Sequence, residues 1–188
     1  MRAIPGAGTR VPLWILGSSL YGAQLAAALG LPYAFASHFA PEALLPALEV
    51  YRASFRPSPS LEAPYAMVGA NAVVADDDAE ARRLFTSAQQ SFANILRGRR
   101  GRLPPPIDDI DAYWTDAERE RASAMLSRSF VGSPSTVRAW LEAFAAETAA
   151  DEIIVAAAIH DHAARLRSYG LLAEIVRGGM GDQPPRRP

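Results

Sequence analysis

The segment VPLWILGSSLYGAQLAAALGLPYAFAS, residues 11–37, decides the fold of this chain. It opens with a continuous apolar run, residues 11–16, which is typical of a strand buried on both faces. Residues 20–29 are rich in Ala and Leu, which favour helix, and a glycine and a proline then end that helix. Residues 33–36 begin a second apolar strand. The segment therefore predicts a β–α–β unit, which connects parallel strands.

The turn between the first strand and the helix reads Gly17-Ser18-Ser19 and predicts an anion site. Free backbone N–H groups, two hydroxyls and the positive end of the helix dipole meet at this point. We expect the turn to hold a phosphate, with a cofactor as its source. Tyr21, in the first helical turn, can add a further hydroxyl. A plain helix cap without phosphate has the same sequence, so that alternative stays open.

Similar units follow along the chain. The strands expected from the pattern lie near residues 12–16, 32–36, 65–75 and 152–158. The expected helices lie near residues 20–29, 41–55, 76–96, 118–129, 134–149 and 161–177. Strands that alternate with helices predict an α/β fold with a parallel sheet. Four such strands are half of a (β/α)8 barrel, which needs about 250 residues.

The chain of 188 residues is expected to form one domain over residues 1–177. Residues 97–117, RGRRGRLPPPIDDIDAYWTDA, combine glycines, a proline triplet and clustered charge, so they predict a long loop or insertion. Four arginines in this loop would suit nucleic-acid contact, but a solvated loop agrees better with the net charge of −1. Residues 178–188, GGMGDQPPRRP, are expected to be disordered.

The composition excludes several kinds of chemistry. With 49% hydrophobic residues and almost no net charge, the chain is typical of a globular protein without a nucleic-acid partner. It has no Cys, which excludes disulfides and thiolate chemistry, and all 19 basic residues are Arg, which excludes a Schiff base. The absence of a long apolar run or a signal-peptide pattern predicts a cytoplasmic protein with no membrane partner.

Four blocks of sequence carry a family resemblance. They are the LGSS turn with its Ala-rich helix and GLPYAFASHF, NAVVADDD with the following Glu-Ala-Arg, FVGSP at 130–134, and DEIIVAAAIHDHAARLRS at 151–168. In this order they resemble the flavin-dependent monooxygenases of the bacterial-luciferase-like class. The resemblance spans about residues 1–177 and implies the C-terminal half of a (β/α)8 TIM barrel, with about four parallel strands. We expect a natural truncation, a gene fragment or a misplaced start codon.

The resemblance also implies a function. A member of this class is an oxidoreductase that uses reduced FMN and O₂ on a small organic substrate, with a flavin reductase as electron supplier. The turn at residues 17–19 would bind the FMN phosphate through backbone amides and the Ser18 hydroxyl. A deazaflavin, F420, serves the wider class and is the alternative cofactor. The alternative functions are a truncated, non-catalytic flavin-binding or barrel-completing subunit, or a gene fragment.

A partial barrel has an expected consequence for association. Its two outer strands keep open edges, and the face of the sheet that would line the barrel is only half covered. We therefore expect the chain to be unstable alone, or to associate with itself or with a complementary half-barrel. The resemblance assigns no catalytic residue, because the family also uses residues from the half that is not present here.

Three more places lie in or just after expected strands, toward the end where barrels gather their functional groups. Ser37 and His38, with an aromatic neighbour, can face a flavin ring or an aldehyde-like substrate. The alternative is a loop histidine that satisfies backbone groups. Asn71 can point inward from the third strand and contact the cofactor, or serve only as a polar interior residue. His160 follows the last strand and is expected to face the mouth of the barrel.

Two clusters raise the question of a metal. The side chains of His160-Asp161-His162 diverge on a strand-to-helix turn and match no zinc motif, so Asp161 is expected to cap the last helix instead. The run Asp76-Asp77-Asp78 precedes a helix, where acidic residues complement the dipole. Three adjacent carboxylates rarely bind one divalent cation. The sequence therefore predicts no metal site.

Overall fold

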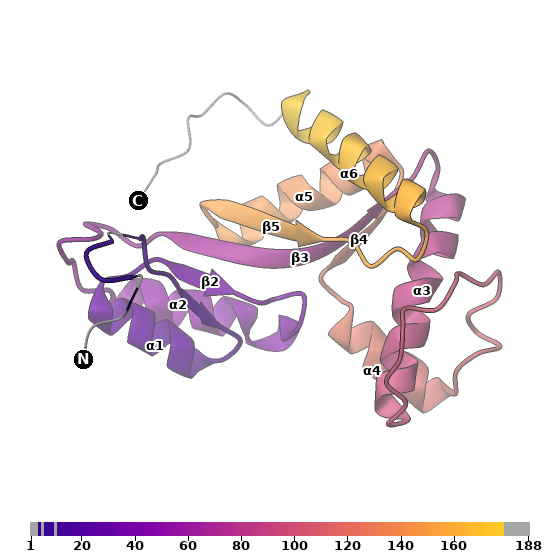
Figure 1. Cartoon of the computed structure of the whole chain (residues 1–188), viewed down its shortest axis with the longest axis horizontal. Helices are drawn as coiled ribbons and strands as arrows, with labels where there is room; N and C mark the ends of the chain where they lie inside the picture. The colour runs from indigo at the N-terminus through magenta and orange to yellow at the C-terminus, as the bar shows by residue number, and fades with distance from the viewer. Residues whose placement is uncertain (1–3, 5, 10, 179–188) are drawn as a thin grey trace.

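The computed structural model describes residues 4, 6–9 and 11–178. Its elements are β1 (Ile15–Gly17), α1 (Leu20–Leu29), β2 (Tyr33–Phe35), η1 (Pro41–Ala43), α2 (Leu44–Ser54), β3 (Ala66–Val74), α3 (Asp78–Leu96), α4 (Asp116–Met125), β4 (Ser129–Gly132), α5 (Pro134–Thr148), β5 (Glu152–Ala156) and α6 (His162–Arg177). All the strands pair in parallel in one sheet, which confirms the predicted α/β class (Figure 1). The predicted disorder of residues 178–188 falls outside the described residues except at Gly178, which follows α6.

The long strand β3 forms the centre of the sheet (Figure 1). Met67 and Val68 each pair with β2 on one edge and with β5 on the other. Asn71 pairs with Ser129 of β4 and with Ala156 of β5, so β4 continues the edge of β3 where β2 ends. Within the described residues, β1 pairs with β2 alone and β5 with β3 alone. The outer edges of β1 and β5 are therefore open.

One face of the sheet packs against helices. The residues of β3 that point to this face are all buried: Ala66, Val68, Ala70, Ala72 and Val74. They form one apolar cluster with buried residues of α1, α2, α5 and α6. Figure 1 shows α1 and α2 beside β2, and α5 and α6 over the opposite end of β3. The small side chains on the strand allow these helices to approach closely.

The opposite, inner face of the sheet has little cover. Successive side chains of a strand point to opposite faces, so Leu16 of β1 and Ile154 of β5 lie on this side. They are 73% and 57% exposed. Among the described residues, cover comes from the His38 ring over Gly69 and from the C-terminal end of β3, where Val73 packs with Leu84 of α3 and with Ile159. Exposed apolar residues on one sheet face are typical of an interaction surface.

The helical hairpin of α3 and α4 is inserted between β3 and β4 (Figure 1). The predicted loop agrees with residues 97–115, which contain no helix or strand. However, the loop is held against α3. Arg97 forms an ion pair with Glu118 of α4, with N···O distances of 2.7 and 2.9 Å. Gln90 of α3 donates a hydrogen bond to the carbonyl oxygen of Pro105, at 2.9 Å.

Two strands and one helix end differ from the expectation. The first strand, expected over residues 11–16 and buried on both faces, is limited to Ile15–Gly17, and Val11, Leu13 and Leu16 are exposed. The helix expected over 118–129 begins at Asp116, after a capping box of Thr115 and Glu118, and ends at Met125. Residues 129–132 form β4 instead, which makes a fifth strand. A strand of four residues is too short for its alternation to stand out in the sequence. No helix among residues 11–178 is long and apolar enough to cross a membrane.

Candidate functional site

The turn between β1 and α1 is built on a close approach of two glycines. A Cβ on Gly17 would lie 3.3 Å from the Cα atom of Gly22 and 3.3 Å from the Tyr33 hydroxyl, so a side chain here would require these neighbours to shift slightly. The Tyr33 hydroxyl donates a hydrogen bond to the carbonyl oxygen of Ser19, at 3.3 Å. Burial raises the pKa of Tyr33 to about 12, so this hydroxyl stays protonated and remains a donor. The hydrogen bond from Tyr33 thus holds the backbone of the turn in place.

Among the described residues, no side chain caps the N-terminus of α1. Ser19 is the N-cap, with φ −152° and ψ 169°, but its side chain makes no capping hydrogen bond, and the first turn has no acidic residue. In contrast, a side-chain oxygen caps each of α3, α4, α5 and α6. The helix α2 likewise has no capping side chain, so the plain helix cap stays open as the alternative at Ser19. The backbone N–H groups and the positive dipole end are available to an anion, together with the exposed Tyr21 in the first turn. The phosphate role of Gly17, Ser18, Ser19 and Tyr21 stays a prediction.

Ser37 and His38 lie over Gly69 of β3. On one edge of β3, Gly69 lies between the residues that pair with β2 and the residues that pair with β4. The backbone carbonyl of Gly69 accepts a hydrogen bond from the buried Ser37 hydroxyl. The His38 ring lies so close that a Cβ on residue 69 would overlap its Nδ1 atom. That Nδ1 atom is buried, and within the described residues it has no hydrogen-bond partner. The alternative of a histidine that satisfies backbone groups is therefore not supported.

Asn71 lies two residues beyond Gly69, on the same inner face of β3. Its Nδ2 atom donates a hydrogen bond to the Ser129 hydroxyl of β4, at 3.3 Å. The structure thus brings Ser37, His38 and Asn71 together on the inner face. The sequence interpretation missed Gly69 and Ser129. An isolated glycine inside a strand was an available signal, because it marks a close approach.

His160 stands apart from this group. It is exposed in the loop between β5 and α6, and no hydrogen bond joins its side chain to the described residues. The next residue, Asp161, caps α6 by accepting a hydrogen bond from the Ala164 backbone N–H at 2.8 Å, which confirms the predicted cap. Across residues 4, 6–9 and 11–178, no three His, Asp or Glu side chains lie close enough to hold a metal ion.

The three adjacent aspartates serve three separate contacts. Asp76 pairs with Arg167 of α6, and this hydrogen bond lowers the pKa of its carboxyl. Asp77 caps α3 through a bond of 2.8 Å from the first turn. Asp78 accepts a hydrogen bond of 2.6 Å from the Ser133 backbone N–H, which lowers its pKa. The run therefore connects α3 to α6 and to the start of α5.

Comparisons with known proteins agree with this architecture. The model of the luciferase-like monooxygenase family matches residues 1–152. A luciferase-like monooxygenase of Escherichia coli K12 is 51% identical over 181 residues, which are 96% of this chain and 54% of that protein. The crystal structure of apo-MsnO8 is similar with a TM-score of 0.74 and 33% identity, over 93% of this chain and 52% of that one.

A more distant structure shares the fold. The oxygenating constituent of 3,6-diketocamphane monooxygenase from Pseudomonas putida, a type II Baeyer–Villiger monooxygenase in complex with FMN, is 19% identical with a TM-score of 0.57. The match covers 92% of this chain and 50% of that one. The chain therefore spans about half the length of the proteins that it matches. By the match to its family model, it belongs to the luciferase-like monooxygenase family.

Proposed function

We propose that this chain is part of a flavin-dependent oxidoreductase that uses reduced FMN and O₂ on a small organic substrate. The observation that carries the proposal is the N-terminus of α1, which offers backbone donors and hydroxyls without an internal anion. Membership of the luciferase-like monooxygenase family supports a flavin as the source of the phosphate. F420 is the alternative cofactor. A flavin reductase is the expected electron supplier.

Within this proposal, the residues of the chain bind and position. The backbone amides of the turn and the Ser18 hydroxyl donate to the phosphate, and Tyr33 holds the turn in place. His38 and Asn71 offer polar atoms on the inner face, where they can orient a substrate oxygen by hydrogen bonding. When bound, reduced flavin supplies the electrons that activate O₂. His160 is exposed in the loop between β5 and α6, at the same end of the sheet, and could contact a substrate only from that loop.

A coupled assay tests this proposal. The purified chain is mixed with FMN, NADH and a flavin reductase, and O₂ uptake is measured with a panel of aldehydes and ketones. The proposal predicts substrate-dependent uptake and an oxygenated product, both lost in Ser18→Asp and retained in Ser123→Asp, an exposed serine of α4 with the same change of charge. Uptake equal to that of free reduced flavin with every substrate would contradict catalysis by this chain alone.

The exposed inner face supports a second candidate function, that of a barrel-completing subunit. Leu16 and Ile154 are exposed there, and the strands that carry them have open edges. A second copy of the chain or a complementary half-barrel can cover them. The test mixes the chain with the separately expressed part of the Escherichia coli relative that it does not match. A 1:1 complex that binds FMN more tightly than either part supports this function, and no complex contradicts it.

A further inference from the structure

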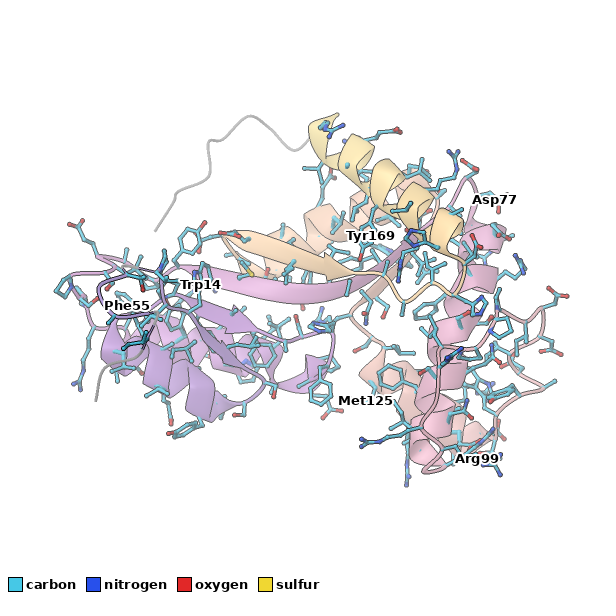
Figure 2. The ribbon with its side chains drawn as sticks, in the orientation of Figure 1. Trp14, Phe55, Asp77, Arg99, Met125 and Tyr169 are labelled. Carbon is cyan, nitrogen blue, oxygen red and sulfur yellow. The ribbon has the colours of Figure 1, made fainter. Side chains whose placement is uncertain are left out.

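A cavity of about 590 Å³ lies between the loop after β2 and the C-terminal end of α3. Its lining includes Phe39, Asn94, Ile95, Arg99, Arg100 and Arg102. In Figure 2, Arg99 lies at the opposite end of α3 from Asp77, where the inserted hairpin turns. The candidate flavin site does not include this cavity.

The local sequence explains why the arginines reach the cavity. Gly98 has a φ of +71°, in the left-handed region that favours glycine. The Gly98 backbone N–H donates to the carbonyl oxygen of Ile95 at 3.0 Å, and that of Arg99 donates to Asn94 at 2.8 Å. This pair of bonds ends α3 and reverses the chain, as in a Schellman turn. The arginines that follow then line the cavity instead of extending the helix.

The arginines of this segment divide into two kinds. Arg97 is already used, because it pairs with Glu118 and its guanidinium lies 4.8 Å from the centre of the Tyr113 ring. By contrast, Arg99, Arg100 and Arg102 take part in none of the ion pairs among residues 11–178. The part of the chain that the structure describes contributes no Asp or Glu to the cavity lining. Three arginines in the lining of one cavity favour an oxyanion, with which guanidinium groups form paired hydrogen bonds.

The remaining wall of the cavity combines apolar residues with the polar Ser91 and Asn94. Phe39 is 61% exposed and Ile95 is 52% exposed, so both present apolar surface beside the arginines. An anionic head with an apolar body would satisfy both parts of the wall. Phe39 directly follows His38, whose ring lies against Gly69 of β3. The cavity is therefore next to the polar residues of the inner face.

We propose that this cavity binds an organic anion, a carboxylate or similar oxyanion on an apolar body, and so selects anionic substrates beside the flavin site. The arginines hold the head, and Phe39 and Ile95 contact the body. That the bound anion is a substrate rests on the proposed function, whereas binding of the anion needs no flavin. The phosphate of the cofactor is an oxyanion too, and the test distinguishes it from a substrate anion.

Hexanoate and its neutral analogue hexanamide are the probes. Backbone amide NMR at low ionic strength follows Gly98, Gly101 and Asn94 during titration of the wild-type chain. We expect saturable shifts with hexanoate, an affinity at least about tenfold weaker for hexanamide, and loss of the hexanoate affinity with added NaCl. Equal affinity for the two probes, or no shifts with either one, would overturn the proposal without any variant.

Two triple variants with the same change of net charge localise the effect. Arg99→Gln/Arg100→Gln/Arg102→Gln should weaken hexanoate binding at least about tenfold. The control replaces three exposed arginines of other segments, Arg56→Gln/Arg82→Gln/Arg121→Gln, and should stay within about twofold of wild type. Equal losses in both variants would mean that net charge alone attracts the probe, and would overturn the site.

FMN titration of the same two variants separates the two sources of the anion. If the cavity-lining variant loses FMN affinity but keeps its hexanoate affinity, the cavity serves the cofactor phosphate, and the proposal is wrong. If hexanoate binds as expected while FMN binds to neither the wild type nor the control, the proposed flavin function fails and the anion cavity stands. The two failures are therefore distinguishable.

Discussion

At Gly69, the absence of a side chain lets the His38 ring lie against β3. We expect Gly69→Ala to displace this ring and to lower the free energy of unfolding by about 1–3 kcal/mol, because the new Cβ overlaps Nδ1 in a closely packed place. Urea unfolding followed by circular dichroism measures the change. Gly170→Ala in α6 is the control, since its Cβ would meet nothing within 4 Å. That control should raise the stability by about 0.5–1 kcal/mol, and an equal loss in both variants would argue against the His38 contact.

Ser18 is the residue on which the phosphate assignment depends most directly. Ser18→Asp should lower the affinity for FMN at least about tenfold, because a carboxylate would face the phosphate at the helix N-terminus. Fluorescence quenching of FMN measures this affinity. Ser123→Asp adds the same charge at an exposed position of α4 and should leave the affinity unchanged. If Ser18→Asp also binds FMN as the wild type does, the turn is not the phosphate site.

At the scale of residues, local features could be predicted and distant contacts could not. Asp161 was predicted as a cap because its partner, Ala164, lies in the next helical turn. The bond between Asn71 and Ser129 joins residues 58 positions apart, and the contact of His38 with Gly69 also depends on how two strands pair. No local pattern encodes such contacts. The grouping of the inner-face residues therefore needed the structure, whereas their positions in or after strands did not.

The contact between α3 and α4 depends on Glu118, which pairs with Arg97 and closes the capping box. The hydrogen bond from Arg97 is the main cause that lowers the pKa of Glu118 to about 2, below its usual value of about 4.5. A depressed pKa in the folded state stabilises the fold above the ordinary pKa, and this contribution is lost as the pH falls toward the lower value. The anchoring of α4 should therefore weaken between about pH 4.5 and pH 2.

A comparison of variants isolates this pH dependence from that of other carboxyls. Glu118→Gln should be less stable than the wild type at pH 7, and the difference should shrink steadily as the pH falls from 4.5 to 2.5. Unfolding in urea at several pH values gives the difference. Glu142→Gln, at an exposed position of α5, should differ little from the wild type at any pH. A difference for Glu118→Gln that does not change with pH would contradict the ion-pair explanation.

At the scale of elements, long and strongly patterned segments were predicted best. The helices α1, α5 and α6 carry clear start or stop residues, and their bounds match the expectation closely. The strand β4 was missed because its four residues owe their conformation to pairing with β3. The end of α4 was misplaced for the same reason, since nothing local to residues 126–129 ends the helix. Strand pairing at that edge is a tertiary effect.

At the scale of the whole molecule, the inner face of the sheet exposes apolar side chains to solvent, which is unfavourable. We expect the purified chain to form a dimer or a larger assembly, which size exclusion with light scattering measures. Leu16→Glu/Ile154→Glu should shift the chain toward a monomer, because charges on this face oppose apolar contact. Leu29→Glu/Leu166→Glu changes exposed helical leucines instead and should not shift it. A stable wild-type monomer would contradict the expected association.

At this scale the α/β class, the partial barrel and the family agree with the expectation from the four sequence blocks. The α/β class could be predicted because repeated βα units fix a parallel sheet regardless of local detail. The family and the partial barrel were implied by the resemblance of the four blocks. The cavity beside Phe39 could not, since it forms only when the end of α3 meets the loop after β2. The arginines of residues 97–102 were visible in the sequence, but their common cavity was not.

The most direct test of the central claim is a paired titration of the wild-type chain with FMN and with riboflavin, which lacks the phosphate. If the turn of Gly17, Ser18 and Ser19 binds the phosphate, FMN should bind at least about tenfold more tightly than riboflavin. Inorganic phosphate should then weaken FMN binding and leave riboflavin binding unchanged. Equal affinity for the two flavins, or competition by phosphate against both, would contradict the assignment of the turn as the flavin phosphate site.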